Sequence, residues 1–99
     1  MERSATIVGG GLAGCEASRI LAKAQIPVRL YEMRPKVSTA AHKSTDLAEL
    51  VCSNSLGSQD LSTGKGLLLS EMRQLGSLVV EAATQNAVPA GNSLAVARE

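Results

Sequence analysis

A glycine pattern, G-x-G-x-x-G, separates a strand-like run from a helical pattern near the start of the chain. Its three glycines are Gly9, Gly11 and Gly14. Residues 5–8 before it are short, apolar and partly β-branched, which is typical of a buried strand. Residues 12–24 after it place apolar side chains at helical spacing, and residues 28–32 again resemble a strand. Consecutive parallel strands need such a crossover, so the sequence predicts an α/β fold with a Rossmann-like β-α-β unit.

Each glycine of the pattern meets a separate demand of a bound dinucleotide. The first allows a tight turn, the second lets the backbone approach a pyrophosphate, and the third lets the helix pack close to the strand. The free N–H groups and partial positive charge of the helix start favour the phosphates. The residues predicted to bind the cofactor here are Gly9, Gly10, Gly11, Leu12, Ala13 and Gly14.

Glu32 follows Gly14 by 18 residues, at the end of the second predicted strand. An acidic side chain at this offset accepts hydrogen bonds from the hydroxyls of the adenosine ribose. A carboxylate also disfavours a 2′-phosphate, so NADP is disfavoured at this site. The alternatives are a tight turn without a ligand and, for Glu32, a solvated charge. These residues indicate an adenine dinucleotide and do not distinguish FAD from NAD.

The remaining sequence predicts one further long helix and several loops. Residues 33–45 and 53–64 are polar and rich in turn-forming residues, and residues 46–52 resemble the start of a short helix. Residues 66–83 form the longest helical pattern. Its predicted apolar stripe consists of Leu68, Met72, Leu75, Val79 and Ala82 or Ala83. We predict one domain over residues 1–99, an incomplete part of a longer FAD-binding or NAD-binding protein.

Composition is ordinary for a soluble globular chain, with 44% hydrophobic residues, 19% charged residues and a net charge of +1. The lysines and arginines are scattered, so no basic nucleic-acid-binding patch is predicted within these residues. No apolar run reaches membrane-spanning length, and the opening residues lack the pattern of a signal peptide. Two separated cysteines and one histidine predict neither a metal site nor a disulfide framework, which favours a reduced, cytoplasmic setting.

Several residues invite a chemical interpretation that the sequence alone does not favour. Gly64-Lys65-Gly66 lacks the spacing and the hydroxyl residue of a nucleotide triphosphate-binding loop. His42 is a lone loop histidine, and Cys15 is assigned to packing. Cys52, beside polar residues at the predicted end of a helix, is either a reactive thiol or a small packed side chain, and the residues alone favour packing.

Five segments, in order, closely resemble the N-terminal part of the folate- and FAD-dependent tRNA (uracil-5-)-methyltransferases. They are residues 9–17, 30–35, 47–55 and 71–77, and a last segment made of residues 88–91 followed by residues 94–96. The blocks Tyr-Glu-Met-Arg-Pro at residues 31–35 and Cys-Ser-Asn-Ser at residues 52–55 are the specific ones. The chain departs from the family pattern where Leu47, Gly57 and Ala97 replace the usual Phe, Arg and Asp.

The resemblance implies a cytoplasmic bacterial enzyme that forms 5-methyluridine in the T-loop of tRNA. The carbon would come from 5,10-methylenetetrahydrofolate and the electrons from FAD reduced by NAD(P)H. Residues 9–14 and Glu32 would bind FAD, and Cys52 would be a candidate thiolate nucleophile, although a cysteine beyond residue 99 could serve instead. Contacts with tRNA would lie beyond residue 99, so this chain alone is expected to be inactive. No oligomeric state is predicted.

Two alternatives remain at this stage. The related FAD proteins that build carboxymethylaminomethyl groups on the tRNA wobble uridine share the glycine turn and the Gly-Lys-Gly segment. They usually lack the Tyr-Glu-Met-Arg-Pro block, so the sequence favours the methyltransferases. The other alternative is a flavin-binding fragment without catalysis.

Overall fold

A computed structural model describes residues 3–50 and 53–97 of the chain. The chain divides into two compact units, residues 1–51 and residues 52–99, and each is described by itself. The assignment of residues 1–99 to a single domain therefore stays a prediction.

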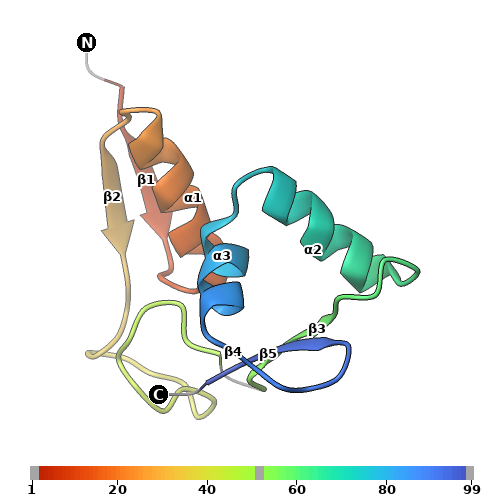
Figure 1. The fold of residues 1–99 in the computed structure, drawn as a ribbon. Helices are drawn as coiled ribbons and strands as arrows, with labels where there is room; N and C mark the ends of the chain where they lie inside the picture. Colours follow the sequence, from red (N-terminus) through yellow and green to blue (C-terminus); the bar gives the residue numbers. More distant parts are fainter. Residues whose placement is uncertain (1–2, 51–52, 98–99) are drawn as a thin grey trace. The chain divides into compact units, whose positions relative to one another are not determined.

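The first unit is the predicted β-α-β unit. Strand β1 (Ala5–Val8) leads into helix α1 (Leu12–Lys23), which returns the chain to strand β2 (Val28–Tyr31) (Figure 1). The two strands are parallel and run in register from Ala5 opposite Val28 to Val8 opposite Tyr31. The predicted fold class, α/β with a Rossmann-like β-α-β unit, is confirmed.

Helix α1 ends at Lys23, within one residue of the helical pattern predicted over residues 12–24. Gln25 adopts a left-handed backbone with φ +62°. Its N–H donates to the carbonyl of Ala22, and the N–H of Ile26 donates to the carbonyl of Leu21, both at 3.0 Å. This pair of bonds is a Schellman motif, which satisfies the last carbonyls of the helix and turns the chain toward β2.

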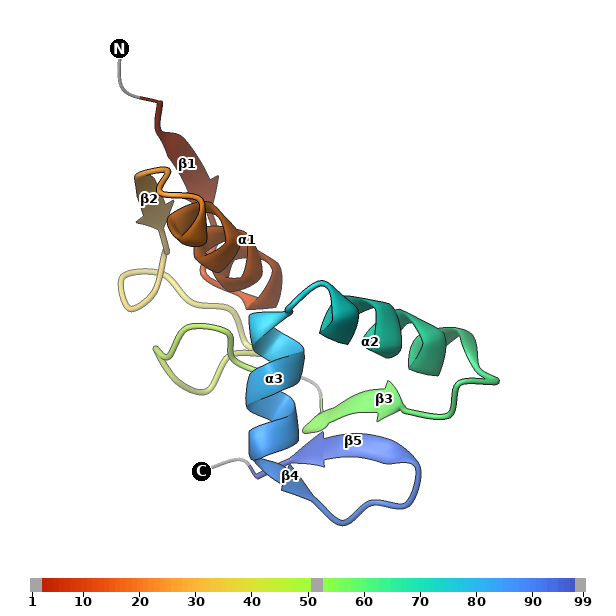
Figure 2. The same ribbon diagram turned by 45° about the horizontal axis from the view of Figure 1, so that its top comes forward.

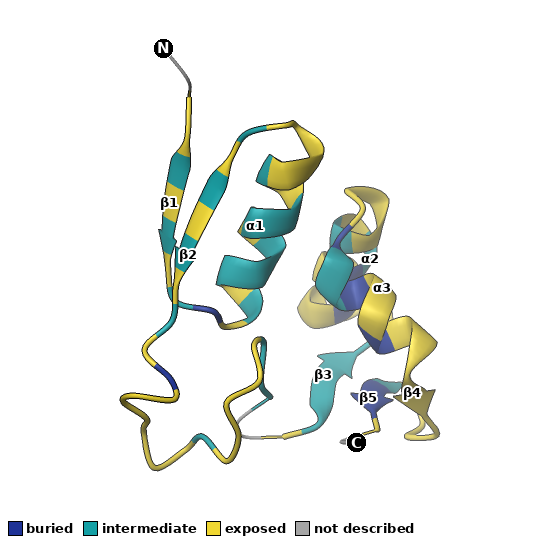
Figure 3. Ribbon diagram, turned by 90° about the vertical axis from the view of Figure 1, so that its left-hand side faces the viewer, coloured by how far each residue is buried: buried dark blue, intermediate teal, exposed yellow. Residues whose placement is uncertain are grey.

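Within the first unit, helix α1 packs on one face of the β1–β2 sheet. Ala5 and Ile7 on β1 are half-buried, whereas Val8 is 85% exposed (Figure 3). The prediction of a buried strand is therefore correct for one face only. Helical spacing predicts an apolar face of α1 made of Ala13, Ala17, Ile20, Leu21 and Ala24. Of these residues only Leu21 is half-buried, and the other four are exposed, so the buried face of α1 differs from the predicted one.

Residues 33–50 form no helix or strand. The predicted polar loop is present, but the predicted helix is wrong for residues 46–50, and its last two residues lie outside the described ones. The physical reason is tertiary. The carbonyl of Asp46 accepts a hydrogen bond from Arg34, and Ala48 adopts a left-handed backbone with φ +57° that a helix does not contain.

The second unit packs two helices against a small antiparallel sheet (Figure 2). Its helices are α2 (Gly64–Gln74) and α3 (Leu78–Gln85), and its strands are β3 (Ser55–Ser58), β4 (Ala87–Val88) and β5 (Ser93–Val96). The strand order is β3-β5-β4. Strand β3 lies inside the segment predicted to be a loop, so that prediction is wrong there.

The predicted long helix over residues 66–83 is divided at Gly76. Gly76 has φ +79°, and the N–H groups of Gly76 and Ser77 donate to the carbonyls of Arg73 and Met72 at 3.1 and 3.0 Å. This Schellman motif ends α2. The hydroxyl of Ser77 then accepts a hydrogen bond from the N–H of Val80 at 3.1 Å, which caps the start of α3.

Of the predicted stripe, only Ala83 belongs to the buried core of the second unit. The buried apolar residues of that core are Leu69, Val80, Ala83, Leu94, Ala95 and Val96. Leu68 and Leu75 of the predicted stripe are exposed, Leu75 by 84%. The division at Gly76 changes which helical face points inward on each side of it, so one continuous stripe does not describe both helices.

Candidate functional site

The glycine turn between β1 and α1 has the backbone that the motif requires. Gly9 has φ +104°, a conformation that L side chains rarely adopt, and it turns the chain out of β1. A Cβ atom on Gly14 would collide with the carbonyl oxygen of Gly9, so only glycine allows α1 to approach this closely. A Cβ atom on Gly11 would meet no described atom within 4 Å. The space beside Gly11 is therefore open for a ligand.

Among the described residues, no side chain caps the N-terminus of helix α1. Gly11 is its N-cap residue and makes no side-chain capping bond, and the first turn contains no acidic residue. The first bonded amide is that of Cys15, which donates to the carbonyl of Gly11 at 3.0 Å. The N–H groups of Leu12, Ala13 and Gly14 precede it at the helix start, where amides lack intrahelical acceptors and suit an anion.

Glu32 follows β2 directly and lies against the glycine turn. Its Oε1 accepts a hydrogen bond from the N–H of Gly10 at 2.9 Å. Its Oε2 accepts two hydrogen bonds from Arg34, one from Nε at 2.7 Å and one from the backbone N–H at 3.0 Å. The sequence thus placed Glu32 correctly beside the turn, although it did not predict the partners of the carboxylate.

These bonds keep the Glu32 carboxyl ionised. The side-chain hydrogen bond from Arg34, followed by the backbone N–H groups of Gly10 and Arg34, lowers the pKa of Glu32 from 4.5 to about 2. An ionised carboxylate only accepts hydrogen bonds. Oε1 accepts one described hydrogen bond, from the N–H of Gly10, whereas Oε2 accepts two. Oε1 can therefore accept a further hydrogen bond, which a ribose hydroxyl could donate.

A second acidic residue, Glu49, joins the same network. Its Oε1 accepts from Nη1 of Arg34 at 3.2 Å and from the backbone N–H and the hydroxyl of Ser44 at 2.9 and 2.6 Å. The Ser44 hydroxyl, then the backbone N–H of Lys43, lowers the pKa of Glu49 to about 2. Both Arg34 and Glu49 lie in segments that resemble the family, residues 30–35 and 47–55, but the sequence assigned neither of them a role.

Residues 47 and 48 lie on the glycine turn. The N–H of Ala48 donates to the carbonyl of Gly10 at 2.7 Å, and a Cβ atom on Gly10 would lie 2.5 Å from Cδ2 of Leu47. Gly10 is consequently buried between this segment and Glu32. A side chain at this second position of the motif, which the fingerprint leaves variable, would require the exposed Leu47 side chain to move.

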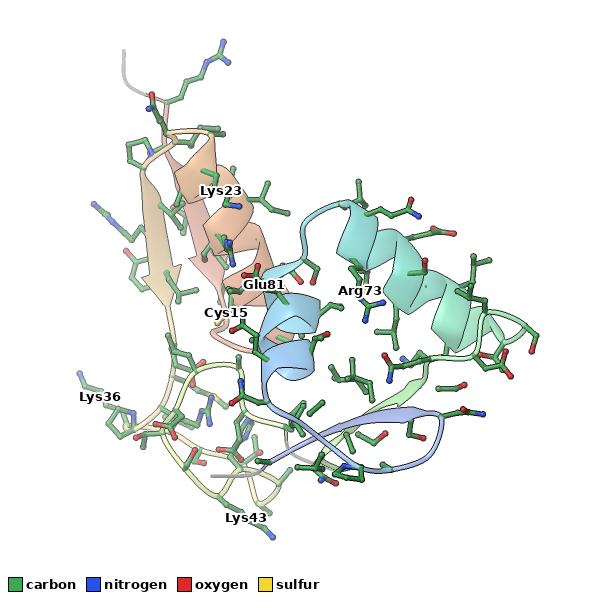
Figure 4. The ribbon with its side chains drawn as sticks, in the orientation of Figure 1. Cys15, Lys23, Lys36, Lys43, Arg73 and Glu81 are labelled. Carbon is green, nitrogen blue, oxygen red and sulfur yellow. The ribbon has the colours of Figure 1, made fainter. Side chains whose placement is uncertain are left out.

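The chain has two cysteines, Cys15 and Cys52. Cys15 lies near the start of α1, where its Sγ is 3.5 Å from the carbonyl of Gly10 (Figure 4). It is a half-buried free thiol in a weak hydrogen bond, which agrees with its assignment to packing. Cys52, the candidate nucleophile, lies outside the described residues, so its role stays a prediction.

Within residues 3–50 and 53–97, no group of three or more His, Cys, Asp or Glu side chains could hold a metal ion. No helix among them is long and apolar enough to span a membrane. The Gly64-Lys65-Gly66 segment opens α2, where the Thr63 hydroxyl accepts from the N–H of Gly66 at 3.0 Å and so occupies the helix start.

A family model and several relatives match this chain over nearly its whole length. Residues 4–99 match the family model described as glucose inhibited division protein A. A relative from Lactobacillus gasseri is 57% identical over 99 residues, all of this chain and 23% of the relative. Relatives from Aquifex aeolicus and Nitratidesulfovibrio vulgaris are 57% and 55% identical, covering 100% and 97% of this chain and 22% and 20% of their own lengths.

Each of these three relatives is named methylenetetrahydrofolate–tRNA-(uracil-5-)-methyltransferase TrmFO. The resemblance drawn from the sequence blocks is therefore confirmed. The chain spans about a fifth to a quarter of the length of these relatives, from 20% to 23%.

Proposed function

The chain belongs to the glucose inhibited division protein A family, and on that premise we propose that its glycine turn and Glu32 bind FAD. The open space beside Gly11, next to an uncapped helix start, is the observation that carries this proposal. The pyrophosphate would accept hydrogen bonds from the amides of residues 11–14. The adenosine ribose would donate to Oε1 of Glu32, whose ionised carboxylate disfavours a 2′-phosphate.

The larger activity that this segment would serve is tRNA methylation. The names of the relatives support a protein that forms 5-methyluridine in tRNA. We propose that the site is a T-loop uridine, that 5,10-methylenetetrahydrofolate supplies the carbon, and that FAD reduced by NAD(P)H supplies the electrons. Contacts with tRNA would come from residues outside this chain, and the proposed setting is the cytoplasm.

Cys52 is the proposed nucleophile, since a thiolate can add to a pyrimidine ring and activate carbon 5. In the whole protein, Cys52→Ser is expected to lower the formation of 5-methyluridine more than Cys15→Ser does. The modified nucleoside can be quantified by mass spectrometry of digested tRNA. Equal losses in the two variants would return Cys52 to a packing role.

The FAD site can be tested directly on the 99-residue chain by titration calorimetry. The informative variant is Gly11→Val, because Gly11 has φ −79° and its Cβ would meet no described protein atom. The fold should tolerate the substitution, while the added side chain would occupy the space proposed for the pyrophosphate. We expect FAD affinity to fall by at least about tenfold, on the order of 1.4 kcal/mol.

Gly64→Val is the matched control. Gly64 also lies at the start of a helix, α2, and its Cβ would likewise meet no described atom within 4 Å. This variant should bind FAD as the unaltered chain does. A Gly11→Val chain that retains full affinity would refute the assignment of the turn.

The same samples separate the alternatives. The FAD-loaded chain can be incubated with tRNA, 5,10-methylenetetrahydrofolate and NADH. Binding of FAD without any 5-methyluridine would support a flavin-binding part that needs the rest of the protein. Absence of FAD binding would contradict the proposal at its first step.

A further inference from the structure

Arg34 is a buried arginine whose donors are almost fully used inside the first unit. Its side chain is only 2% exposed. Nε donates to Oε2 of Glu32 at 2.7 Å, and Nη1 donates to Oε1 of Glu49 at 3.2 Å and to the carbonyl of Ser44 at 2.9 Å. Nη2 donates to the carbonyl of Asp46 at 3.1 Å. These bonds account for four of the five N–H donors of a guanidinium.

The first consequence concerns the orientation of Glu32. Arg34 binds Oε2 twice, through Nε and through its backbone N–H, so this oxygen faces away from the glycine turn. The other oxygen, Oε1, is thereby directed to the N–H of Gly10. A carboxylate held at both oxygens has little rotational freedom left to lose when a ribose hydroxyl binds.

The second consequence concerns residues 44–49. Arg34 binds this segment at two carbonyls and at the Glu49 carboxylate, and Ala48 binds the carbonyl of Gly10 at 2.7 Å. The segment has no helix or strand of its own. Its position against the turn therefore depends on these bonds.

We propose that Arg34 is a positioning residue for the adenosine ribose, which orients the Glu32 carboxylate and fixes residues 44–49 against the glycine turn. The inference rests on the proposed binding of FAD. In NADP sites an arginine binds the 2′-phosphate of the ribose, whereas Arg34 would bind the carboxylate that receives the ribose hydroxyls. Because its donors are bound to protein oxygens, Arg34 supports selection for an unphosphorylated ribose.

The test is the pH dependence of FAD affinity, measured by calorimetry from pH 3 to pH 8. In the unaltered chain, affinity should stay constant as the pH falls to about 4, because the pKa of Glu32 is lowered to about 2. Arg34→Gln removes the side-chain hydrogen bond from Arg34, which is the largest cause of the lowered pKa of Glu32. We expect affinity at pH 7 to fall at least about tenfold, as for the loss of hydrogen bonds to a charged group. We also expect the pH at which binding is lost to move upward, toward 4.5.

Arg29→Gln is the matched control, because Arg29 is an exposed arginine on β2. It should leave both the affinity and the pH profile unchanged. Arg34→Lys keeps one positive charge but not the planar set of donors, so it should retain the fold and restore part of the affinity. Circular dichroism at each pH separates loss of binding from unfolding, and Arg34→Lys keeps the test open if Arg34→Gln does not fold.

A double-mutant cycle shows whether Arg34 acts through Glu32. In a Glu32→Gln chain, adding Arg34→Gln should lower FAD affinity by less than it does in the unaltered chain, because only the bonds from Arg34 to residues 44–49 are then left to lose. An equal loss in the two backgrounds, or unchanged affinity and pH profile in both Arg34 variants, would overturn the inference. An unaltered chain that does not bind FAD would instead overturn the proposed function, so the two failures are distinguishable.

Discussion

At the scale of single residues, the three glycines of one motif are required for different reasons. Gly9 is required by its backbone, with φ +104°. Gly14 is required by packing, because a Cβ atom would collide with the carbonyl of Gly9. Gly11 has an ordinary backbone and open space beside it, so nothing in the described protein demands glycine there. Under the proposed function, the need for glycine at residue 11 would come from the bound pyrophosphate, which would lie where a side chain would otherwise project.

This difference gives a stability prediction. Gly14→Ala should lower the free energy of unfolding of the first unit by about 1–3 kcal/mol, the usual cost of overpacking. Gly11→Ala should change it by less than about 0.5 kcal/mol. Urea unfolding followed by circular dichroism measures both. Equal losses in the two variants would show that the close approach of α1 to the turn is not as described.

Sequence reasoning reached Glu32 but not the residues that hold it. The spacing between the glycine turn and the end of β2 is local, so the acid could be located from the sequence. The bonds of Arg34 join Glu32 to Ser44, Asp46 and Glu49, across a loop without regular structure. No periodicity marks such a loop, so these partners became visible only in the folded chain.

At the scale of elements, the two strands and the helix of the β-α-β unit could be predicted because each carries its own signals. Strand β1 ends at glycine, and α1 ends before Pro27. Strand β3 could not be predicted in the same way, because its sequence is Ser-Leu-Gly-Ser. It becomes a strand through its antiparallel pairing with β5, and its own sequence contains no strand pattern from which this pairing could be predicted.

The division between α2 and α3 was present in the sequence but was outweighed by the apolar pattern. Gly76 and Ser77 are the residue types that end one helix and begin the next. Reading them as a boundary would have separated Leu69, which is buried in α2, from Val80 and Ala83, which are buried in α3. Gly76 and Ser77 therefore mark the boundary between α2 and α3, which the continuous apolar stripe does not contain.

At the scale of the whole molecule, all described residues of the proposed site come from the first unit. The turn, Glu32, Arg34 and residues 44–49 lie within residues 1–51. A unit of about fifty residues buries little surface and is marginally stable alone. A ligand that binds only the folded state adds stability by mass action, about 2.7 kcal/mol at one hundred times its Kd. Bound FAD should therefore change the stability of this unit more than that of the second one.

Amide hydrogen exchange measures this difference residue by residue. With FAD at about one hundred times its Kd, exchange in β1, β2 and residues 44–48 should slow by up to about one hundredfold, since the ligand stabilises by about 2.7 kcal/mol. The N–H groups of Gly10 and Ala48, which donate to Glu32 and to Gly10, should be among those protected. Amides of β3 and β5 should change little. FMN, which lacks the adenosine and the pyrophosphate, is the control ligand and should protect neither unit. Equal protection of β1 and β5 by FAD would contradict the prediction, because it would mean that the two units open together.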